Sequence, residues 1–205
     1  MSAIDRAAAL PRDGLLCEKL LVAVTGSPAA LSMPQYVLIL RETLARTVHV
    51  IMSRGAQRFV RPYTMRLFAD SWVHTDTYTV ADGILVPHIE LTDDLDLLLV
   101  MPATANMIAK AAHGICDDLV STAITASDAP VVFVPAMNAR MWANRAVQRN
   151  VELARDIGYH VLDPGSGLQL ADMATAIGMM PPLEQVLGEL TAIVRTSRSR
   201  GRVVV

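Results

Sequence analysis

The sequence predicts a single α/β domain built on a doubly wound parallel sheet. Two observations support this prediction. Short apolar runs without alternating polar residues recur along the chain, as expected for strands whose two faces are both covered by helices. Each run ends at small, polar, Gly or Pro residues and is followed by a segment with helical spacing, and this alternation builds parallel sheets through right-handed crossovers. A length of 205 residues and a hydrophobic content of 52% suit one such domain with a sizeable core.

The expected elements follow in order along the chain. Apolar runs predict strands at 20–24, 49–52, 95–101, 131–134 and 159–162. Helical spacing between them predicts helices at 30–46, 56–69, 106–113, 116–127, 141–157 and 183–195, with Pro62 near the start of the second or interrupting it. Residues 70–90 are mixed, and residues 164–182 read as a loop containing Gly and Pro. These elements predict a Rossmann-like (flavodoxin-like) domain at 19–195, between a flexible leader at 1–18 and a flexible tail at 196–205.

Composition and charge argue against several functional classes. The formal net charge is −2 and the body of the chain has no block of like charge, so no nucleic-acid interface is expected. Two cysteines, Cys17 and Cys116, are too few for a disulfide framework, and neither they nor the histidines have metal-ligand spacing, so no metal is expected. Neither a signal pattern nor an apolar run long enough to span a membrane is present, which favours a cytoplasmic protein without membrane contact.

Small polar residues follow four of the predicted strands, at 25–28, 53–55, 102–107 and 135–138. In doubly wound sheets, ligands bind at the carboxyl ends of the strands. Gly26 allows close backbone approach, and Ser27 and Ser53 offer hydroxyls just ahead of helices, a combination that suits a phosphate. The same residues could be ordinary turn residues and helix caps. The chain has neither G-x-G-x-x-G after the first strand nor a P-loop, which argues against a dinucleotide or nucleoside triphosphate site.

Three ordered motifs carry a family resemblance. Residues 102–107, Pro-Ala-Thr-Ala-Asn-Met, resemble the Pro-Ala-Ser-Ala-Asn-Thr motif of the homo-oligomeric flavin-containing cysteine decarboxylases. Residues 135–142, Pro-Ala-Met-Asn-Ala-Arg-Met-Trp, are similar to that family's Pro-x-Met-Asn-x-x-Met-Trp motif. His88-Ile89-Glu90-Leu91, 14 residues ahead of Pro102, resembles the segment with the family's active-site histidine, and 114–119 also matches a family stretch. The resemblance covers residues 20–190, and Thr104 and Met107 are its departures in the first motif.

The resemblance implies a cofactor and roles for individual residues. It implies FMN, with FAD as the alternative, bound by Gly26, Ser27, Pro28, Ser53, Thr104, Ala105, Asn106, Met107 and Ala136. His88 would be the catalytic acid/base, with Asn106 beside the flavin ring, and Asn138 and Met141 would contact the substrate. His88 could instead hold the Pro87 loop, and both asparagines could be helix caps. Cys116 is expected to be a buried structural thiol.

The resemblance also divides two substrate branches. Decarboxylases of phosphopantothenoylcysteine, in coenzyme A biosynthesis, carry a cysteine in the loop after the last strand that helps to reduce the enethiol, whereas residues 167–181 contain no cysteine. We therefore expect oxidative decarboxylation of the C-terminal cysteine of a ribosomally made precursor peptide, as in lantibiotics, with an aminoenethiol as product. The alternatives are the coenzyme A branch and a non-catalytic flavin-binding regulatory protein. Flavin prenyltransferases lack the Pro-x-Met-Asn pattern.

The family's assembly is a further expectation. Its members build trimers with the flavin at subunit boundaries, commonly stacked into dodecamers, and a chain rich in hydrophobic residues suits burial between subunits. Residues 57–75, including Phe68 and Trp72, are expected to contribute to a neighbour's pocket. The loop at 165–181 is expected to close over the peptide.

Overall fold

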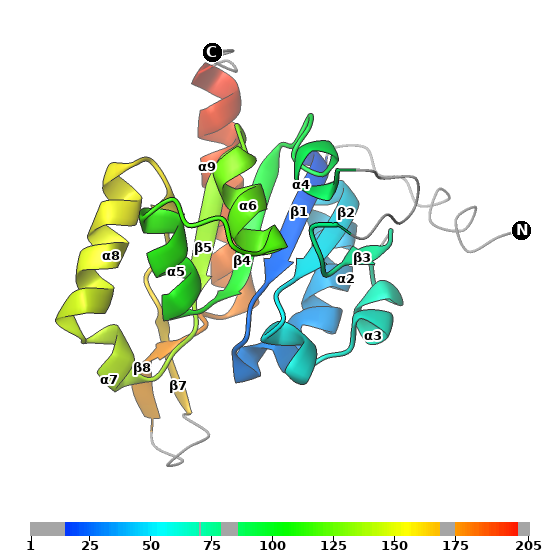
Figure 1. The fold of residues 1–205 in the computed structure, drawn as a ribbon. Coiled ribbons are helices and arrows are strands. Elements are labelled where there is room, and N and C mark those ends of the chain that lie inside the picture. Colours follow the sequence, from blue (N-terminus) through cyan, green and yellow to red (C-terminus); the bar gives the residue numbers. More distant parts are fainter. Residues whose placement is uncertain (1–14, 70, 79–85, 169–174, 201–205) are drawn as a thin grey trace, which may run out of the picture.

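The computed structural model describes residues 15–69, 71–78, 86–168 and 175–200, and its architecture confirms the predicted fold class (Figure 1). A six-stranded parallel sheet has the order β3-β2-β1-β4-β5-β6. Its strands are β1 (Cys17–Val24), β2 (Ala45–Met52), β3 (Val73–His74), β4 (Leu97–Ala103), β5 (Val131–Pro135) and β6 (His160–Val161). The switch point between the two halves of the sheet lies at β1 and β4, so their carboxyl ends mark the expected ligand site.

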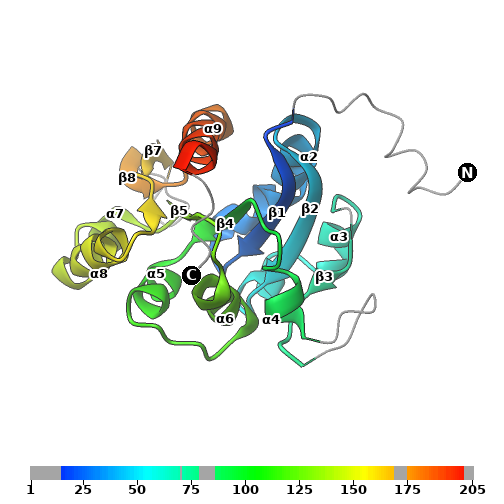
Figure 2. The same cartoon turned by 90° about the horizontal axis from the view of Figure 1, so that it is seen from above.

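Helices cover both faces of the sheet, as the view from above shows (Figure 2). One face carries η1 (Pro28–Ser32), α2 (Met33–Thr43), η2 (Ala56–Arg58), α3 (Pro62–Arg66) and α9 (Leu183–Arg200). The other carries α4 (Pro87–Glu90), α5 (Ala105–Ala112), α6 (Leu119–Ala126) and α8 (Arg145–Asp156). β1 explains the two cores, because Leu20, Val22 and Val24 face the first and Leu21 and Ala23 the second.

The segment expected to be a Gly- and Pro-containing loop forms a second, smaller sheet. β7 (Gly165–Leu168) and β8 (Thr175–Met179) pair as an antiparallel hairpin beside α7 (Ala139–Trp142). The residues between the two strands lie outside the described part of the chain. The hairpin places this segment next to the second family motif.

Several predicted boundaries are wrong, and each error has a local cause. The 56–69 helix is split into η2 and α3, because Pro62 cannot continue a helix and starts a new one. The 141–157 helix is split into α7 and α8, because the Asn144 side chain accepts a hydrogen bond from the Ala146 amide and caps a new helix there. The expected 30–46 helix becomes η1 and α2, and β2 begins immediately afterwards at Ala45.

The expected leader and tail were both drawn too long. β1 begins at Cys17, which pairs with Ala45, and Asp96 Oδ2 accepts hydrogen bonds from the Glu18 and Lys19 amides. At the other end, α9 continues to Arg200, with Val194 buried against the sheet. Residues 1–14 and 201–205 lie outside the described part of the chain. None of the helices in the described ranges is both long and apolar enough to cross a membrane.

Candidate functional site

Two glycines bring the loops after β1 and β2 into contact. A Cβ on Gly26 would lie 2.9 Å from both Cα and the carbonyl carbon of Gly55, closer than real Cβ atoms approach backbone. A Cβ on Gly55 would in turn lie 3.1 Å from Gly26 Cα. Any side chain at Gly26 therefore has to push the two backbones apart. The sequence placed Gly26 at the site, but Gly55 was missed as a site residue because its role depends on a contact across the sheet.

The hydroxyls of Ser27 and Ser53 flank this contact. Ser27 caps η1, and its Oγ accepts a hydrogen bond of 3.4 Å from the Ala29 amide. Ser53 Oγ accepts a hydrogen bond of 3.3 Å from the Ala56 amide, at the start of η2. Both residues are thus helix-start residues, as the alternative interpretation held. A hydroxyl that accepts a hydrogen bond keeps its own proton to donate, so the capping role does not exclude anion binding.

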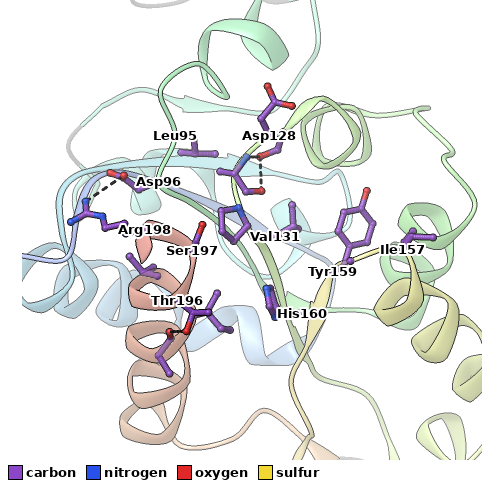
Figure 3. Close-up of a pocket in the computed structure, with 17 residues that line it drawn as sticks. Leu95, Asp96, Asp128, Val131, Ile157, Tyr159, His160, Thr196, Ser197 and Arg198 are labelled. Carbon is purple, nitrogen blue, oxygen red and sulfur yellow. Dashed lines mark hydrogen bonds and ion pairs between the residues drawn. The ribbon is translucent and has the colours of Figure 1, made fainter. Parts of the chain in front are cut away.

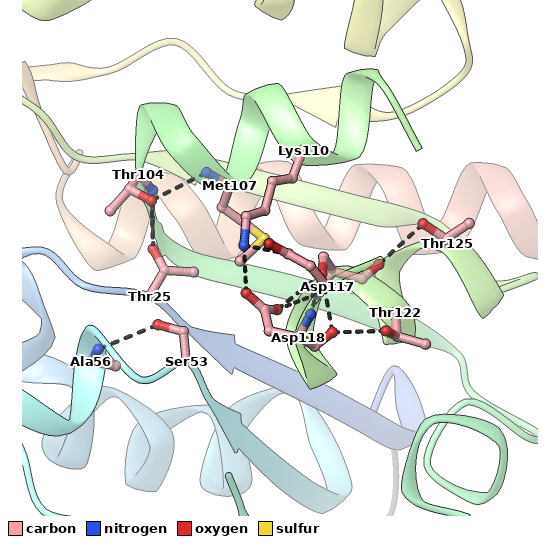
Figure 4. Close-up of polar contacts among 11 residues, drawn as sticks. Thr25, Ser53, Ala56, Thr104, Met107, Lys110, Asp117, Asp118, Thr122 and Thr125 are labelled. Atoms are coloured by element: carbon pink, nitrogen blue, oxygen red, sulfur yellow. Dashed lines mark hydrogen bonds and ion pairs between the residues drawn. The ribbon is translucent and has the colours of Figure 1, made fainter. Parts of the chain in front are cut away.

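The loop after β4 is joined to the loop after β1 by Thr25, which the sequence did not single out as a site residue. Thr25 Oγ1 donates a hydrogen bond of 2.6 Å to the Pro102 carbonyl and accepts one of 3.0 Å from the Thr104 amide. Thr104 then caps α5, with its Oγ1 accepting from the Met107 amide at 3.3 Å (Figure 4). The first family motif is therefore held against the β1 loop by side-chain hydrogen bonds.

The residues of the first motif divide between the sheet edge and the core. Asn106 is exposed in the first turn of α5, and Ala105 is half-buried beside it. Met107 is only 2% exposed and packs in the core with Ile108 and Ala111. The structure thus contradicts the expectation that the Met107 side chain contacts a cofactor. The physical reason is helical geometry, since a residue four positions before Ala111 shares its inward face.

The second motif lies beside the hairpin. Ala136 is buried, and its amide donates to the Ala103 carbonyl at 3.0 Å, which ties the β5 loop to β4. Asn138 caps α7, because its Oδ1 accepts a hydrogen bond of 2.8 Å from the Met141 amide. This cap orients the exposed Asn138 side chain and leaves the two Nδ2 protons to donate. Met141 is 44% exposed and is accessible to a ligand.

Gly178 holds the hairpin against this motif. It has a φ of +125°, and its carbonyl accepts a hydrogen bond of 2.8 Å from the Met137 amide. A Cβ at this position would lie 2.5 Å from the Met137 carbonyl oxygen and 3.2 Å from the Asn138 carbonyl carbon. Only glycine permits both this conformation and this approach. The role of Gly178 was missed because its contacts lie some forty residues away in the chain.

An ion-pair cluster braces α5 against the start of α6. Lys110 Nζ donates to the carboxylates of Asp117 and Asp118, and Asp118 also accepts from the Ser121 amide (Figure 4). Burial disfavours the charge of Asp118, but the hydrogen bonds from Lys110 and Ser121 outweigh it and lower the pKa of this carboxyl. The cluster borders a cavity of about 390 Å³ that Ser53 and Arg54 also line. The hollow therefore adjoins the carboxyl ends of β2 and β3.

The structure does not bring His88 to these residues within one chain. α4, which carries His88, is tied to the amino end of β1, where Lys19 Nζ donates to the Glu90 and Asp93 carbonyls at 2.8 and 2.7 Å. Six residues of strand separate Lys19 from Thr25, which corresponds to about 20 Å. His88 is half-buried, and its Nδ1 is buried without a hydrogen-bond partner among the described residues.

The larger hollow of the described molecule lies at the opposite edge of the sheet. It has a volume of about 620 Å³ and is bounded by the amino ends of β4, β5 and β6 and by α9 (Figure 3). It contains none of the motif residues, so its size does not make it the functional site. Its lining includes Asp96, Tyr159, His160 and Arg198.

Neither cysteine lies beside the motif residues. Cys17 is buried at the amino end of β1. Cys116 is exposed, so the expectation of a buried structural thiol is wrong. Gly114 turns the chain outward after α5 with a φ of +65°, and Cys116 Sγ donates to its carbonyl at 3.6 Å. The length of α5, about 12 Å for eight residues, separates this loop from Thr104.

A family model described as Flavoprotein matches residues 12–195. The chain belongs to the Flavoprotein family. Its carboxyl-edge residues fit a flavin, because Gly26 and Gly55 form a cradle that a Cβ would fill and two serine hydroxyls flank it. The sequence resemblance and the expectation of a flavin are thus confirmed at the level of the family.

Solved structures and curated relatives refine this membership. The structure is similar to SpaF, described as an FMN-dependent cysteine decarboxylase, with a TM-score of 0.74 and 30% identity over 87% of this chain and 96% of that one. EpiD, an epidermin biosynthesis protein from Staphylococcus aureus, has been solved with the substrate peptide DSYTC and gives a TM-score of 0.73 and 28% identity, covering 83% and 97% of the two chains. The coenzyme A biosynthesis bifunctional protein CoaBC of Bacillus subtilis is 42% identical over 120 residues, 58% of this chain and 30% of that protein. The chain spans less than half the length of the CoaBC relatives it matches.

Proposed function

We propose that this protein binds FMN and oxidatively decarboxylates the C-terminal cysteine of a precursor peptide, releasing an aminoenethiol. The observation that carries the proposal is the absence of a thiol where the product would be reduced. Residues 164–182 contain no cysteine, and the two cysteines of the chain lie at the amino end of β1 and beyond the far end of α5. The similarity to SpaF and to peptide-bound EpiD supports the same substrate class.

The flavin would lie along the carboxyl edge of β1, β2 and β4. Ser27 and Ser53 would donate their hydroxyl protons to its phosphate, across the Gly26–Gly55 contact. Asn106, exposed at the start of α5, would lie beside the ring. FMN rather than FAD is proposed, because the chain has no dinucleotide fingerprint and SpaF is described as FMN-dependent.

Asn138 would bind the substrate's α-carboxylate. Its Oδ1 is engaged by the Met141 amide, so the side chain presents Nδ2 as a donor in a fixed orientation. A hydrogen bond to a charged partner contributes about 1.5–3 kcal/mol. Only a C-terminal cysteine carries this free carboxylate, which gives the site a reason to select the end of a peptide. The hairpin beside α7 would cover the bound peptide and exclude water.

The bound flavin supplies a two-electron oxidation of the cysteine side chain. Oxidation removes two hydrogens from the Cβ–S unit of the substrate, and the resulting thiocarbonyl accepts the electron pair left by departing carbon dioxide. His88 would take the thiol proton, which an imidazole can do near neutral pH. No thiol in the hairpin segment reduces the enethiol, so this compound is the product.

His88 would reach the flavin from a neighbouring subunit. It lies at the opposite edge of its own sheet from the motif residues, and its buried Nδ1 has no partner in the described part of the chain. The segment expected at a subunit boundary exposes Phe59, Tyr63, Leu67 and Trp72, as an interface would require, whereas Phe68 packs partly into the core. We propose a trimer-based assembly, further stacked into a dodecamer.

A second candidate is phosphopantothenoylcysteine decarboxylation, which the identity of 42% to Bacillus subtilis CoaBC favours. Mass spectrometry of three reactions separates the candidates. A synthetic peptide ending in cysteine should lose carbon dioxide and two hydrogens, while its C-terminal amide should not react. Phosphopantothenoylcysteine is the competing substrate. Loss of carbon dioxide alone, or turnover of this competitor only, would contradict the proposed function.

A further inference from the structure

We propose that Thr25 is a positioning residue that fixes the loop after β1 against the loop after β4 and thereby sets the spacing between the two ends of the flavin site. This inference rests on the proposed binding of FMN. Thr25 directly follows β1, and its side chain is 1% exposed. Its hydroxyl donates to the Pro102 carbonyl at 2.6 Å and accepts from the Thr104 amide at 3.0 Å.

The backbone at this point cannot make the connection itself. The β1–β4 ladder runs from Leu20 opposite Leu97 to Ala23 opposite Val100, and no pair beyond it is formed. Pro102 follows and has no N–H to donate. One Thr25 oxygen therefore takes over both functions of a backbone unit, donating to one buried polar group and accepting from the next. Without it, the Pro102 carbonyl and the Thr104 amide would each lose a partner.

The two loops joined in this way carry opposite ends of the proposed site. Gly26 and Ser27 follow Thr25 in the chain and belong to the phosphate end. Thr104 caps α5 through the Met107 amide and precedes Asn106, which belongs to the ring end. Thr25 Oγ1 also lies 3.4 Å from Thr104 Oγ1. A rigid ligand that spans both loops requires their separation to be correct, so the effect of Thr25 should be seen in affinity for FMN.

The test is a titration of apoprotein with FMN, followed by flavin fluorescence, together with the melting temperature of each apoprotein. Thr25→Val keeps the shape of the side chain and removes the hydroxyl, and it should raise the dissociation constant tenfold or more. Thr25→Ser keeps the hydroxyl and should bind within threefold of wild type. Thr191→Val is the matched control, because Thr191 Oγ1 donates to the Leu187 carbonyl at 2.8 Å within α9, away from the site.

The outcomes separate positioning from stability. A Thr25→Val protein that is folded at the assay temperature and binds FMN as tightly as wild type overturns the inference, whatever its melting temperature. If that variant does not fold, Thr25→Ala replaces it, because a water molecule can occupy the vacated space, and unchanged affinity there also overturns the inference. Wild-type protein that does not bind FMN instead refutes the proposed function.

Discussion

The contact between the hairpin and the second motif is open to a direct test through Gly178→Ala. The new Cβ would lie 2.5 Å from the Met137 carbonyl oxygen, and the residue would have to keep a φ of +125°. An L-residue in a sparsely populated backbone region costs about 1–3 kcal/mol. The displaced Met137–Gly178 hydrogen bond contributes about 0.5–1.5 kcal/mol. We expect about 2–4 kcal/mol to be lost from the docking of the hairpin onto α7.

This loss should act locally. It corresponds to a shift of about 30- to 1000-fold in the equilibrium between docked and undocked hairpin. Amide hydrogen exchange should therefore accelerate in Thr175–Met179 and at Met137, and turnover of the peptide should fall. FMN affinity should stay near the wild-type value, because Ser27 and Ser53 lie on other loops.

Gly188→Ala is the matched control. Gly188 lies inside α9 with nothing within 4 Å of a built Cβ, so alanine there should be neutral or stabilise the helix by about 0.5–1 kcal/mol. Unchanged exchange and turnover in Gly178→Ala would refute the assigned role of this contact.

Two further predictions concern titratable groups. His88→Asn should retain FMN but lose about 10²–10⁴ in turnover, the usual effect of removing one acid/base group, and an unchanged rate would assign the proton transfer elsewhere. Burial, and next the nearby Asp96 charge, raise the pKa of the Cys17 thiol from 9.0 to about 12. Because the folded state keeps its proton while the unfolded state releases it, this contribution to stability is complete below pH 9.0 and is lost as the pH rises toward 12. The free energy of urea unfolding should therefore fall less steeply above pH 9.0 in Cys17→Ala than in wild type, and equal slopes would contradict the assignment.

Local patterns in the sequence account for the sheet and for most of the carboxyl edge. The apolar runs end where β1, β2, β4 and β5 end, so the polar residues after them could be assigned to one edge. Met107 shows the limit of motif matching, because its spacing to Ile108 and Ala111 predicts a core residue although the motif suggests a ligand contact. The sequence carried this information, but the resemblance was given more weight.

Other features depend on contacts between distant parts of the chain. Gly55 and Gly178 matter through backbones they approach, and a single sequence does not reveal such partners. Thr25 resembles any turn residue until Pro102 and Thr104 are placed beside it. The position of His88 relative to the edge depends on the path of the chain between β3 and α4, for which local patterning has no signal. These are tertiary effects that override or supplement local preference.

The central position of β1 has a consequence for the order in which the chain folds. Its pairing with β2 needs only the intervening helix, but Thr25 and Pro102 are separated by 77 positions. An amino-terminal fragment that ends before β4 could form part of the sheet and would still lack the latch between the two loops. Contacts of such large sequence separation slow folding, because the entropy of closing the chain is lost before the contact is gained. During synthesis, the capacity to bind a flavin should therefore appear late and abruptly, after β4 has left the ribosome, rather than grow with each added residue.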